Sequence, residues 1–467
     1  MAQILKNLES KLKKNMEACG VPAACIGVYH KGKLYTAATG ILNINTGVEA
    51  TSDSCFQIGS ITKVFTATLV MQLVEQGRLE LDKPVKHYIP TFQTEDVNAC
   101  GAITIRQLLC HTSGLDGDAT IETDFGRDKL ARFVESCAFL SQIHPPGEYF
   151  SYCNTGFNIA GRLIEVATGK TYEEAAREML IQPLGMDHTA MLPQETLKYR
   201  CAIGHVPAPP DENAPDGAAP KMMISPIPVL ESSGAPAGSF ATMTVADLLK
   251  FACLHLDEGK TFDGTQILSK EGVRAMKTKQ TSIAAPVSEN TTGWGLGWSL
   301  MEWDGEKVIG HDGGTVGQNS FLRIIPSKQT AVCLLTNGGD YMGLKKSLFP
   351  HLFRELAGVC IPDTPAPKDI TANNTLFTGR YENCLVYTEV FEDKGLLHVR
   401  FGAKHSLNEV MPEQIFILKP LSPNTFAICT PDHTVIDIGG AAFLRPDTNG
   451  MTRYIFLGGR IYKRLGY

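Results

Sequence analysis

The sequence predicts an α+β fold: an antiparallel sheet flanked by helices and joined to a mainly helical subdomain, with a small all-β domain after it. Three observations indicate this. β-like segments occur at 23–40 and again at 294–335, helix-like segments dominate from about 60 to 260, and short β-like runs follow residue 370. Strands at both ends of a region with helices between them are typical of one sheet with a helical insertion. The 467 residues suffice for a large domain and a smaller one.

The elements of the first domain follow from local patterns. Two apolar runs, at 23–30 and 34–40, flank Lys31-Gly32-Lys33 and predict a hairpin. Residues 64–74 form an apolar run that is too long and too poor in turn residues for a strand, so we expect a buried helix there. Further strands are expected at 294–300, 320–325 and 330–335, and a closing helix near 343–358.

Two proline-rich segments interrupt the chain. Residues 204–230 are expected to form a long loop, which either borders a binding cleft or is a solvent-exposed insertion. The second segment is a predicted linker at 361–369, which separates a domain at 1–360 from one at 370–467. In the later domain, β-like runs separated by turn residues predict an up-and-down sheet or a small barrel; the runs are 386–391, 396–401 and 453–457.

Composition excludes several classes of function. A net charge of -6 and a pI near 6.1 offer no basic surface for nucleic acid or an anionic membrane. The thirteen cysteines include no Cys-x-x-Cys pair and no Cys/His cluster at metal spacing, so we expect reduced core thiols and no metal. The N-terminus lacks the apolar region of a secretory signal, and no run approaches a membrane span. We therefore expect a cytoplasmic protein.

The pattern Ser-x-x-Lys at Ser60 and Lys63 lies where a turn is expected to become the buried helix. Residues three apart share one face of a helix, so the amine of Lys63 can approach the hydroxyl of Ser60. A buried lysine can lose its proton near neutral pH and act as a general base, directly or through a third group. The helix N-terminus offers N–H groups to an oxyanion. This arrangement indicates acyl transfer through a serine ester, although the tetrapeptide also occurs by chance.

A second polar pair, Tyr152 and Asn154, follows the turn-forming Pro145-Pro146-Gly147 and precedes a helix-like segment. With one residue between them on a loop, both polar ends can point into one cleft. Tyr152 can serve as a phenolate or proton relay beside Lys63, and Asn154 can hydrogen-bond a substrate amide or carbonyl. The alternative is an ordinary turn.

A third pattern, His311-Asp312-Gly313-Gly314, follows a Trp-Gly-Leu-Gly-Trp segment at 294–298. Small residues allow a substrate to lie against the backbone of an edge strand. His311 adds a side chain that ordinarily titrates near neutral pH. The alternative is a glycine-rich hairpin without a ligand.

The order of these motifs resembles the serine β-lactamase and penicillin-binding protein superfamily, in the branch that contains class C β-lactamases, D-stereospecific peptidases and family VIII esterases. The resemblance covers roughly residues 1–360 and includes flanking segments at 104–115, 183–186 and 334–337. It implies a cleft between the sheet and the helical part. Thr378-Gly379-Arg380-Tyr381 resembles the start of a lipocalin-like domain appended to some peptidases and cyclases of this superfamily. Such a domain could bind substrate, cover the cleft, mediate oligomerisation or only add stability.

The resemblance also implies roles for individual residues. Ser60 corresponds to the acylated nucleophile, Lys63 to its basic partner and Tyr152 to the general base and leaving-group acid. The oxyanion hole is implied to use the N–H groups of Ser60 and Gly314. The implied substrate-binding residues are Asn154, His311, Asp312 and Gly313.

The third motif departs from many β-lactamases, which carry Lys-Thr-Gly there and use its cation and hydroxyl to hold the β-lactam carboxylate. Here the motif reads His311-Asp312-Gly313. A histidine is charged only part of the time near neutral pH, and Asp312 would repel a carboxylate if it faced the cleft. β-Lactam hydrolysis is therefore disfavoured. If strand alternation turns Asp312 away from the cleft, the repulsion lapses.

These expectations describe a serine hydrolase or acyltransferase that acts through acyl-Ser60 on an ester, amide or peptide. An esterase or D-stereospecific peptidase ranks first. A peptide-cyclising thioesterase or transesterase ranks second, and a β-lactamase third. A non-catalytic acyl-binding sensor is the candidate from a different class. We expect a small-molecule or peptide substrate and no cofactor, and we leave a homo-oligomer open.

Overall fold

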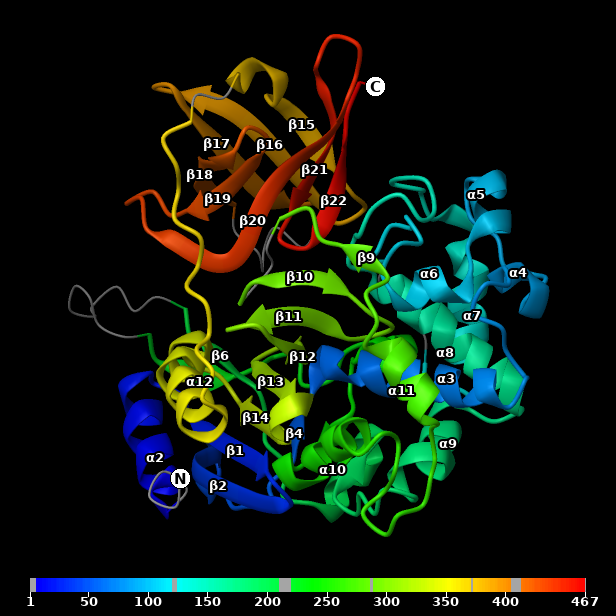
Figure 1. Cartoon of the computed structure of the whole chain (residues 1–467), viewed down its shortest axis with the longest axis vertical. Helices are drawn as coiled ribbons and strands as arrows, with labels where there is room; N and C mark the ends of the chain where they lie inside the picture. The colour runs from blue at the N-terminus through cyan, green and yellow to red at the C-terminus, as the bar shows by residue number, and fades with distance from the viewer. Residues whose placement is uncertain are drawn as a thin grey trace.

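The computed structural model describes residues 6–119, 124–209, 220–285, 289–370, 373–404 and 413–466. An antiparallel sheet of nine strands lies at the centre of the first domain and is built from both ends of that domain, as predicted (Figure 1). The strand order is β3-β2-β1-β14-β13-β12-β11-β10-β9. The strands are β1 Ala23–His30, β2 Lys33–Asn43, β3 Val48–Glu49, β9 Thr281–Ser282, β10 Thr291–Trp294, β11 Ser299–Trp303, β12 Glu306–Thr315, β13 Gln318–Ile325 and β14 Thr330–Thr336.

The prediction of one strand over 294–300 is wrong. β10 ends at Trp294 and β11 begins at Ser299, and these two residues pair across a hairpin. Gly297 in the turn has a φ of +86°, in the left-handed region that glycine favours. A Cβ at Gly297 would lie 2.8 Å from the side chain of Ala67. Residues 294–300 have the apolar sequence of a buried strand because the turn between β10 and β11 packs against α3 and is therefore apolar.

Helices cover both faces of the sheet (Figure 1). α2 and α12 share a hydrophobic cluster with one face, and α3, α8 and α10 share a larger cluster with the other. The helix predicted at 64–74 is α3, in which every residue from Thr62 to Leu73 is buried. The helices are α2 Leu8–Ala18, α3 Thr62–Glu75, α4 Val85–Tyr88, α5 Val97–Ala102, α6 Ile105–Leu109, α7 Lys129–Ser136, α8 Asn154–Thr168, α9 Tyr172–Ala176, α10 Val245–Leu256, α11 Lys270–Met276 and α12 Tyr341–Ala357. None of the described helices is long and apolar enough to cross a membrane.

The segment at 204–230 is not a loop throughout, which corrects the prediction. β6 (His205–Pro207) and β7 (Met222–Ile224) form a two-stranded sheet. His205 is buried, and its Nδ1 donates to the carbonyl of Asn337 at 3.0 Å. Residues 210–219 lie outside the described part of the chain. A further small sheet contains β4 Phe56–Gln57, β8 Thr242–Met243 and β5 Thr189–Ala190.

The C-terminal domain is a closed barrel of eight antiparallel strands in up-and-down order, which confirms the predicted barrel (Figure 1). Aromatic and aliphatic side chains fill it, including Phe377, Tyr381 and Phe443. The segment predicted as a linker, 361–369, contains no helix or strand. The barrel strands are β15 Gly379–Glu382, β16 Val386–Asp393, β17 Leu396–Ala403, β18 Gln414–Ser422, β19 Thr425–Cys429, β20 Val435–Pro446, β21 Thr452–Leu457 and β22 Arg460–Arg464.

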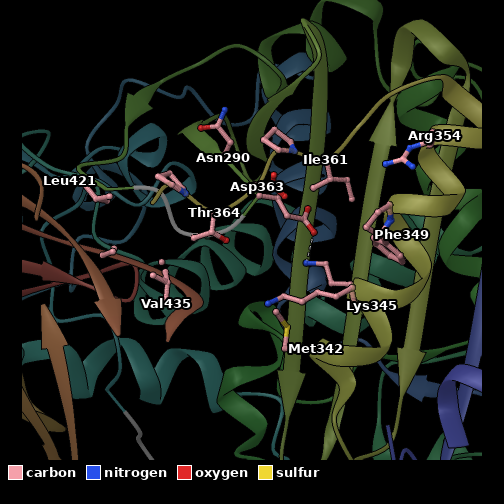
Figure 2. Close-up of a pocket in the computed structure, with 18 residues that line it drawn as sticks. Asn290, Met342, Lys345, Phe349, Arg354, Ile361, Asp363, Thr364, Leu421 and Val435 are labelled. Carbon is pink, nitrogen blue, oxygen red and sulfur yellow. Dashed lines mark ion pairs between the residues drawn. The ribbon is translucent and has the colours of Figure 1, made fainter. Parts of the chain in front are cut away.

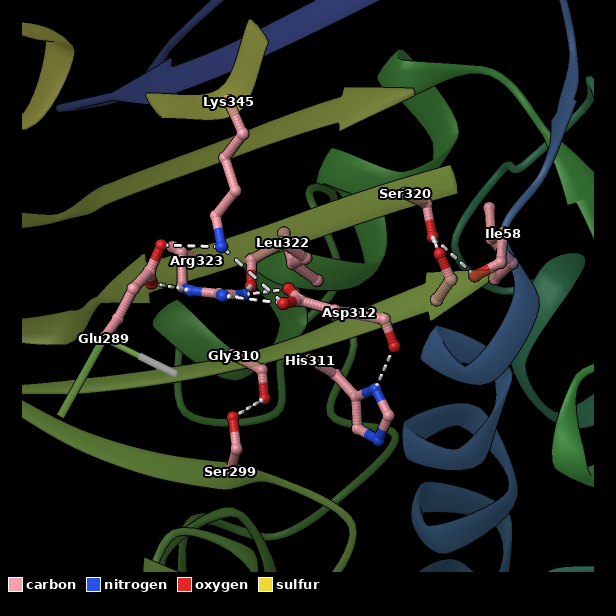
Figure 3. A network of polar contacts seen from close by, with 11 residues as sticks. Ile58, Glu289, Ser299, Gly310, His311, Asp312, Ser320, Leu322, Arg323 and Lys345 are labelled. Atoms are coloured by element: carbon pink, nitrogen blue, oxygen red, sulfur yellow. Dashed lines mark hydrogen bonds and ion pairs between the residues drawn. The ribbon is translucent and has the colours of Figure 1, made fainter. Parts of the chain in front are cut away.

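A network of four charged side chains joins β12, the strand of the third motif, to β13 and α12 (Figure 3); the side chains of Glu289, Arg323 and Lys345 are buried, and that of Asp312 is partly exposed. Arg323 on β13 donates to Glu289 (Nε–Oε2, 2.6 Å) and to Asp312 on β12 (Nη2–Oδ2, 3.0 Å). Lys345 on α12 lies 2.7 Å from Glu289 and 3.7 Å from Asp312. Burial alone would raise the pKa of Asp312, but the charges of Arg323 and Lys345 hold it far below its ordinary value. The two cations balance the two anions.

Replacing Arg323 by Met should lower the free energy of unfolding by about 3 kcal/mol, because the buried carboxylate of Glu289 would lose the guanidinium that pairs with it. The three tryptophans, Trp294, Trp298 and Trp303, all lie in the first domain, so their fluorescence during denaturation reports that domain.

Arg127→Met is the matched control, because it removes an exposed ion pair with Glu174 and should leave the unfolding midpoint unchanged. Equal midpoints for Arg323→Met and Arg127→Met would show that the network does not stabilise the fold.

Candidate active site

Ser60 lies in a 3-10 turn, Gly59–Ile61, directly before α3, and Lys63 lies in the first turn of that helix. The Nζ atom of Lys63 is 2.9 Å from Oγ of Ser60 and donates to the carbonyl of Ala237 at 2.6 Å. Burial, followed by the nearby charge of Arg460, holds the pKa of Lys63 well below its ordinary value. A neutral amine has a lone pair that can take the proton of the Ser60 hydroxyl.

Tyr152 lies on the segment that leads into α8, and its hydroxyl is hydrogen-bonded to the side chain of Ser60. The Nζ atom of Lys63 is 4.9 Å from the centre of the tyrosine ring. Burial raises the pKa of Tyr152 by more than the hydrogen bond with Ser60 lowers it. The hydroxyl is therefore a proton donor at neutral pH, and the phenolate considered from the sequence is not its resting form.

Three aromatic rings lie next to the ring of Tyr152: those of His111, Trp294 and His311. The ring of His111 stacks on it, with 4.3 Å between ring centres, and the Nδ1 atom of His111 accepts from the N–H of Cys153 at 2.9 Å. Trp294 lies 5.2 Å from His111 and 5.5 Å from His311, again between ring centres. Burial holds the pKa of His111 well below its ordinary value, so this ring adds no positive charge beside Tyr152.

His311 and Asp312 point to opposite sides of β12 (Figure 3). His311 is 3% exposed and donates from Nδ1 to the carbonyl of Asp312 at 2.6 Å. Burial and then the charge of Lys63 lower the pKa of His311 to about 3, so the ring is neutral at physiological pH. Asp312 instead pairs with Arg323 and Lys345. The predicted repulsion of a substrate carboxylate by Asp312 therefore lapses, and this side chain is not placed to contact a substrate beside His311.

The backbone of β12 at Gly313 and Gly314 lies directly against the turn that carries Ser60. A Cβ on Gly313 would be 2.8 Å from the nitrogen of Ser60, and a Cβ on Gly59 would be 2.4 Å from the nitrogen of Gly314. Side chains at these glycines would force the two segments apart. The structure thus brings together the two backbone nitrogens that were predicted to form the oxyanion hole.

Asn154 is the first residue of α8, and its Nδ2 donates to Oδ1 of Asp118 at 3.0 Å. Asp118 also pairs with Arg460, whose Nη2 lies 2.8 Å from Oδ1. Arg460 is the first residue of β22 and belongs to the C-terminal barrel. Its guanidinium carbon is 5.2 Å from the centre of the Tyr152 ring. The barrel therefore places a positive charge beside the predicted catalytic tyrosine.

Hydrogen bonds hold the barrel to this region. The N–H of Tyr152 donates to the carbonyl of Gly459 at 2.8 Å, and the N–H of Ile461 donates to the hydroxyl of Ser151 at 3.1 Å. The N–H of Cys384 donates to Asp116 at 2.7 Å. An apolar cluster completes the contact with Ile143, Phe150, Ala285 and Trp294 of the first domain and Ala442, Tyr454, Phe456 and Ile461 of the barrel. The last hairpin of the barrel thus lies at the site.

The sequence assigned no role in the site to His111, Asp118 or Arg460. His111 lies in the flanking segment 104–115, and that position was the available signal. Two carboxylates around one glycine, Asp116-Gly117-Asp118, are a weaker signal. Arg460 follows a Gly-Gly turn in an ordinary barrel hairpin, so no local pattern connects it with Ser60.

A separate cavity of about 370 Å³ lies between α12, the linker and the barrel (Figure 2). Met342 and Phe349 line it from α12, and Leu421 and Val435 line it from the barrel. None of the predicted site residues lines this cavity, so it is not part of the candidate active site.

Comparison with known proteins matches both domains. The family model described as Beta-lactamase matches residues 8–353. Penicillin-binding protein 4 of Amycolatopsis lactamdurans is 42% identical over 349 residues, which are 74% of this chain and 89% of that protein.

Two solved structures are similar. SurE with D-Leu has a TM-score of 0.79 and 27% identity, and the match covers 100% of each chain. The D-amino acid amidase of Ochrobactrum anthropi SV3 complexed with D-phenylalanine has a TM-score of 0.59 and 25% identity, over 74% of this chain and 97% of that one. Together with the position of Ser60 beside Lys63 and Tyr152, these matches show that the chain belongs to the Beta-lactamase family and is a serine hydrolase.

Proposed function

We propose that this protein forms an acyl ester on Ser60 with peptides or amides of D-amino acids, and that Arg460 binds a free carboxylate of the substrate. The observation that carries this proposal is the position of the Arg460 guanidinium, 5.2 Å from the ring centre of Tyr152. A carboxylate held there would lie beside the group that we assign to proton transfer.

The chemistry follows from the arrangement of the side chains. Neutral Lys63 takes the proton of Ser60 as its oxygen attacks the acyl carbon. The N–H groups of Ser60 and Gly314 stabilise the oxyanion, and Tyr152 donates its proton to the leaving group. Water or an amine then attacks the ester and releases the acyl group. Asn154, held by Asp118, remains a proposed contact for a substrate amide or carbonyl.

Arg460 supplies a charge that the third motif does not. His311 is neutral because burial lowers its pKa to about 3, so it cannot replace the lysine found at this motif in many β-lactamases. A guanidinium has five N–H donors, and among the described residues those of Arg460 donate to Asp118 alone. Its remaining donors match the planar geometry of a carboxylate.

Two relatives support the choice of D-amino acids. A structure of SurE is known with D-Leu, and the Ochrobactrum enzyme is named a D-amino acid amidase. The match with SurE extends over the barrel as well as the first domain, so it supports a site to which both domains contribute.

A substrate panel tests the proposal. It contains D-aminoacyl amides, peptides that end in a D-residue as free acid or as amide, a p-nitrophenyl ester and a cephalosporin. We expect the free-acid D-peptides to be turned over best, and Ser60→Ala to lose about 10⁴-fold or more of the activity. Equal activity of Ser60→Ala would contradict the mechanism. Acylation of Ser60 without release, seen by intact mass, would favour the sensor instead.

Arg460→Met should lower kcat/KM for the free-acid peptide by about 10- to 100-fold, because hydrogen bonds to a charged group are worth about 1.5–3 kcal/mol. It should leave kcat/KM for the uncharged p-nitrophenyl ester within about threefold, a smaller change than one such bond would cause. The double variant Asp118→Asn/Arg460→Met checks that an unpaired Asp118 is not the cause.

The control is Arg445→Met, which removes a second ion pair between the same two domains, to Glu148, and should preserve the preference for the free acid. A preference that survives Arg460→Met would rule out Arg460 as the carboxylate site.

The pH dependence of kcat/KM should have an acid limb set by Lys63 and not by His311. The pKa of Lys63 is lowered, so this amine is neutral at high pH and gains its proton, with loss of activity, only as the pH falls through that lowered pKa. His311, with a pKa of about 3, stays neutral throughout the neutral range. Ester hydrolysis by His311→Asn should therefore keep the acid limb at the wild-type pH, whereas a displaced limb would show that His311 titrates during catalysis.

A further inference from the structure

Cys55 and Cys201 lie directly opposite each other in a parallel β-bridge between two distant segments of the first domain. The N–H of Cys55 donates to the carbonyl of Arg200 at 2.9 Å, and the N–H of Ala202 donates to the carbonyl of Cys55 at 2.9 Å. Paired residues in adjacent strands project their side chains to the same face, with backbones about 5 Å apart. That separation lies within the range that a disulfide spans.

The two thiols differ in their hydrogen bonds and in their access to solvent. Sγ of Cys55 donates to the carbonyl of His188 at 3.4 Å, and Sγ of Cys201 donates to the carbonyl of Thr196 at 3.6 Å. Cys55 is 0% exposed, whereas Cys201 is half-buried. The interaction between the two side chains lowers the pKa of Cys201 and, together with burial, raises the pKa of Cys55. Since the thiolate is the reactive form, the accessible Cys201 is the attacking sulfur and Cys55 keeps its proton.

We propose that Cys201 is a site of reversible oxidation by peroxides and that Cys55 is the thiol that resolves it into a disulfide. The Cys201 thiolate attacks one oxygen of the peroxide; a sulfur–oxygen bond forms, the O–O bond breaks, and hydroxide leaves with two electrons gained. The Cys55 sulfur then attacks the Cys201 sulfur; the sulfur–sulfur bond forms, the sulfur–oxygen bond breaks, and water leaves with the Cys55 proton.

The other cysteines do not combine partial exposure, a lowered pKa and a second cysteine directly opposite. Among the cysteines that are not fully buried, Cys19 has its pKa raised by burial and by Asp340, and the Cys384 thiol donates to Asp116. Cys360 is exposed. Across the described residues, no other two cysteines lie opposite each other in a β-bridge.

Gln318 also holds the two segments together. The N–H of Gln57 donates to Oε1 of Gln318 at 3.0 Å, and Nε2 of Gln318 donates to the carbonyl of Ala202 at 3.4 Å. Cys55 precedes Ser60 on the same segment. Oxidation would therefore fasten the strand that leads into Ser60 to the segment at 200–202.

The test uses the reduced full-length protein treated with hydrogen peroxide, followed by alkylation and digestion without a reductant. Mass spectrometry should find the Cys55–Cys201 linked peptide as the main oxidised species, reversed by dithiothreitol. Cys201 should oxidise at least about tenfold faster than Cys360, the gain expected from a larger thiolate fraction. The same yield in Ser60→Ala separates this reaction from the proposed catalysis.

Two variants identify the roles of the sulfurs. Cys55→Ser should lose the disulfide and accumulate a sulfenic acid on Cys201 that dimedone traps, whereas Cys201→Ser should leave Cys55 reduced. If Cys55→Ser fails to fold, detection of the Cys55–Cys201 linked peptide in the wild-type protein still tests the proposal. Oxidation of Cys201 no faster than that of Cys360, or pairing of Cys201 with another cysteine, would overturn the proposal.

Discussion

Two hydrogen bonds join the last hairpin of the barrel to the segment that carries Tyr152, and the geometry of the site depends on them. The N–H of Tyr152 donates to Gly459, and the N–H of Ile461 donates to Ser151. These bonds are made by Gly459 and Ile461, the neighbours of Arg460 in the chain. The same contact therefore fixes the backbone of Tyr152 and positions the guanidinium of Arg460 beside its ring. The ion pair between Arg460 and Asp118 then orients Asn154, so docking of the barrel also fixes the positions of Asp118 and Asn154.

Burial decides the charge of each group in the site. Lys63, His111 and His311 all have a lowered pKa, and burial is the first cause in each case, whereas burial raises the pKa of Tyr152. A neutral amine and a protonated phenol beside the hydroxyl of Ser60 are the acid–base pair that the proposed acyl transfer requires. Positive charge enters the site from the other domain, through Arg460.

Much of the site could be predicted because its chemistry is local in sequence. Ser60 and Lys63 are one helical turn apart, and the buried helix that holds them has an unmistakable apolar run. The side of β12 on which Asp312 lies could be stated only as a condition, since its partners Arg323 and Lys345 come from later elements. Arg460 could not be predicted, because its position depends on how a closed barrel docks. The strand predicted over 294–300 failed because a buried turn and a buried strand share an apolar pattern.

A crystal structure of the Ser60→Ala protein with a peptide that ends in a D-residue with a free carboxylate tests the central claim most directly. We expect the carboxylate to lie about 3 Å from the guanidinium of Arg460, with the scissile carbonyl oxygen directed at the backbone N–H groups of residue 60 and Gly314. A carboxylate bound away from Arg460, with the scissile carbonyl still beside residue 60, would contradict the claim that the barrel completes the active site.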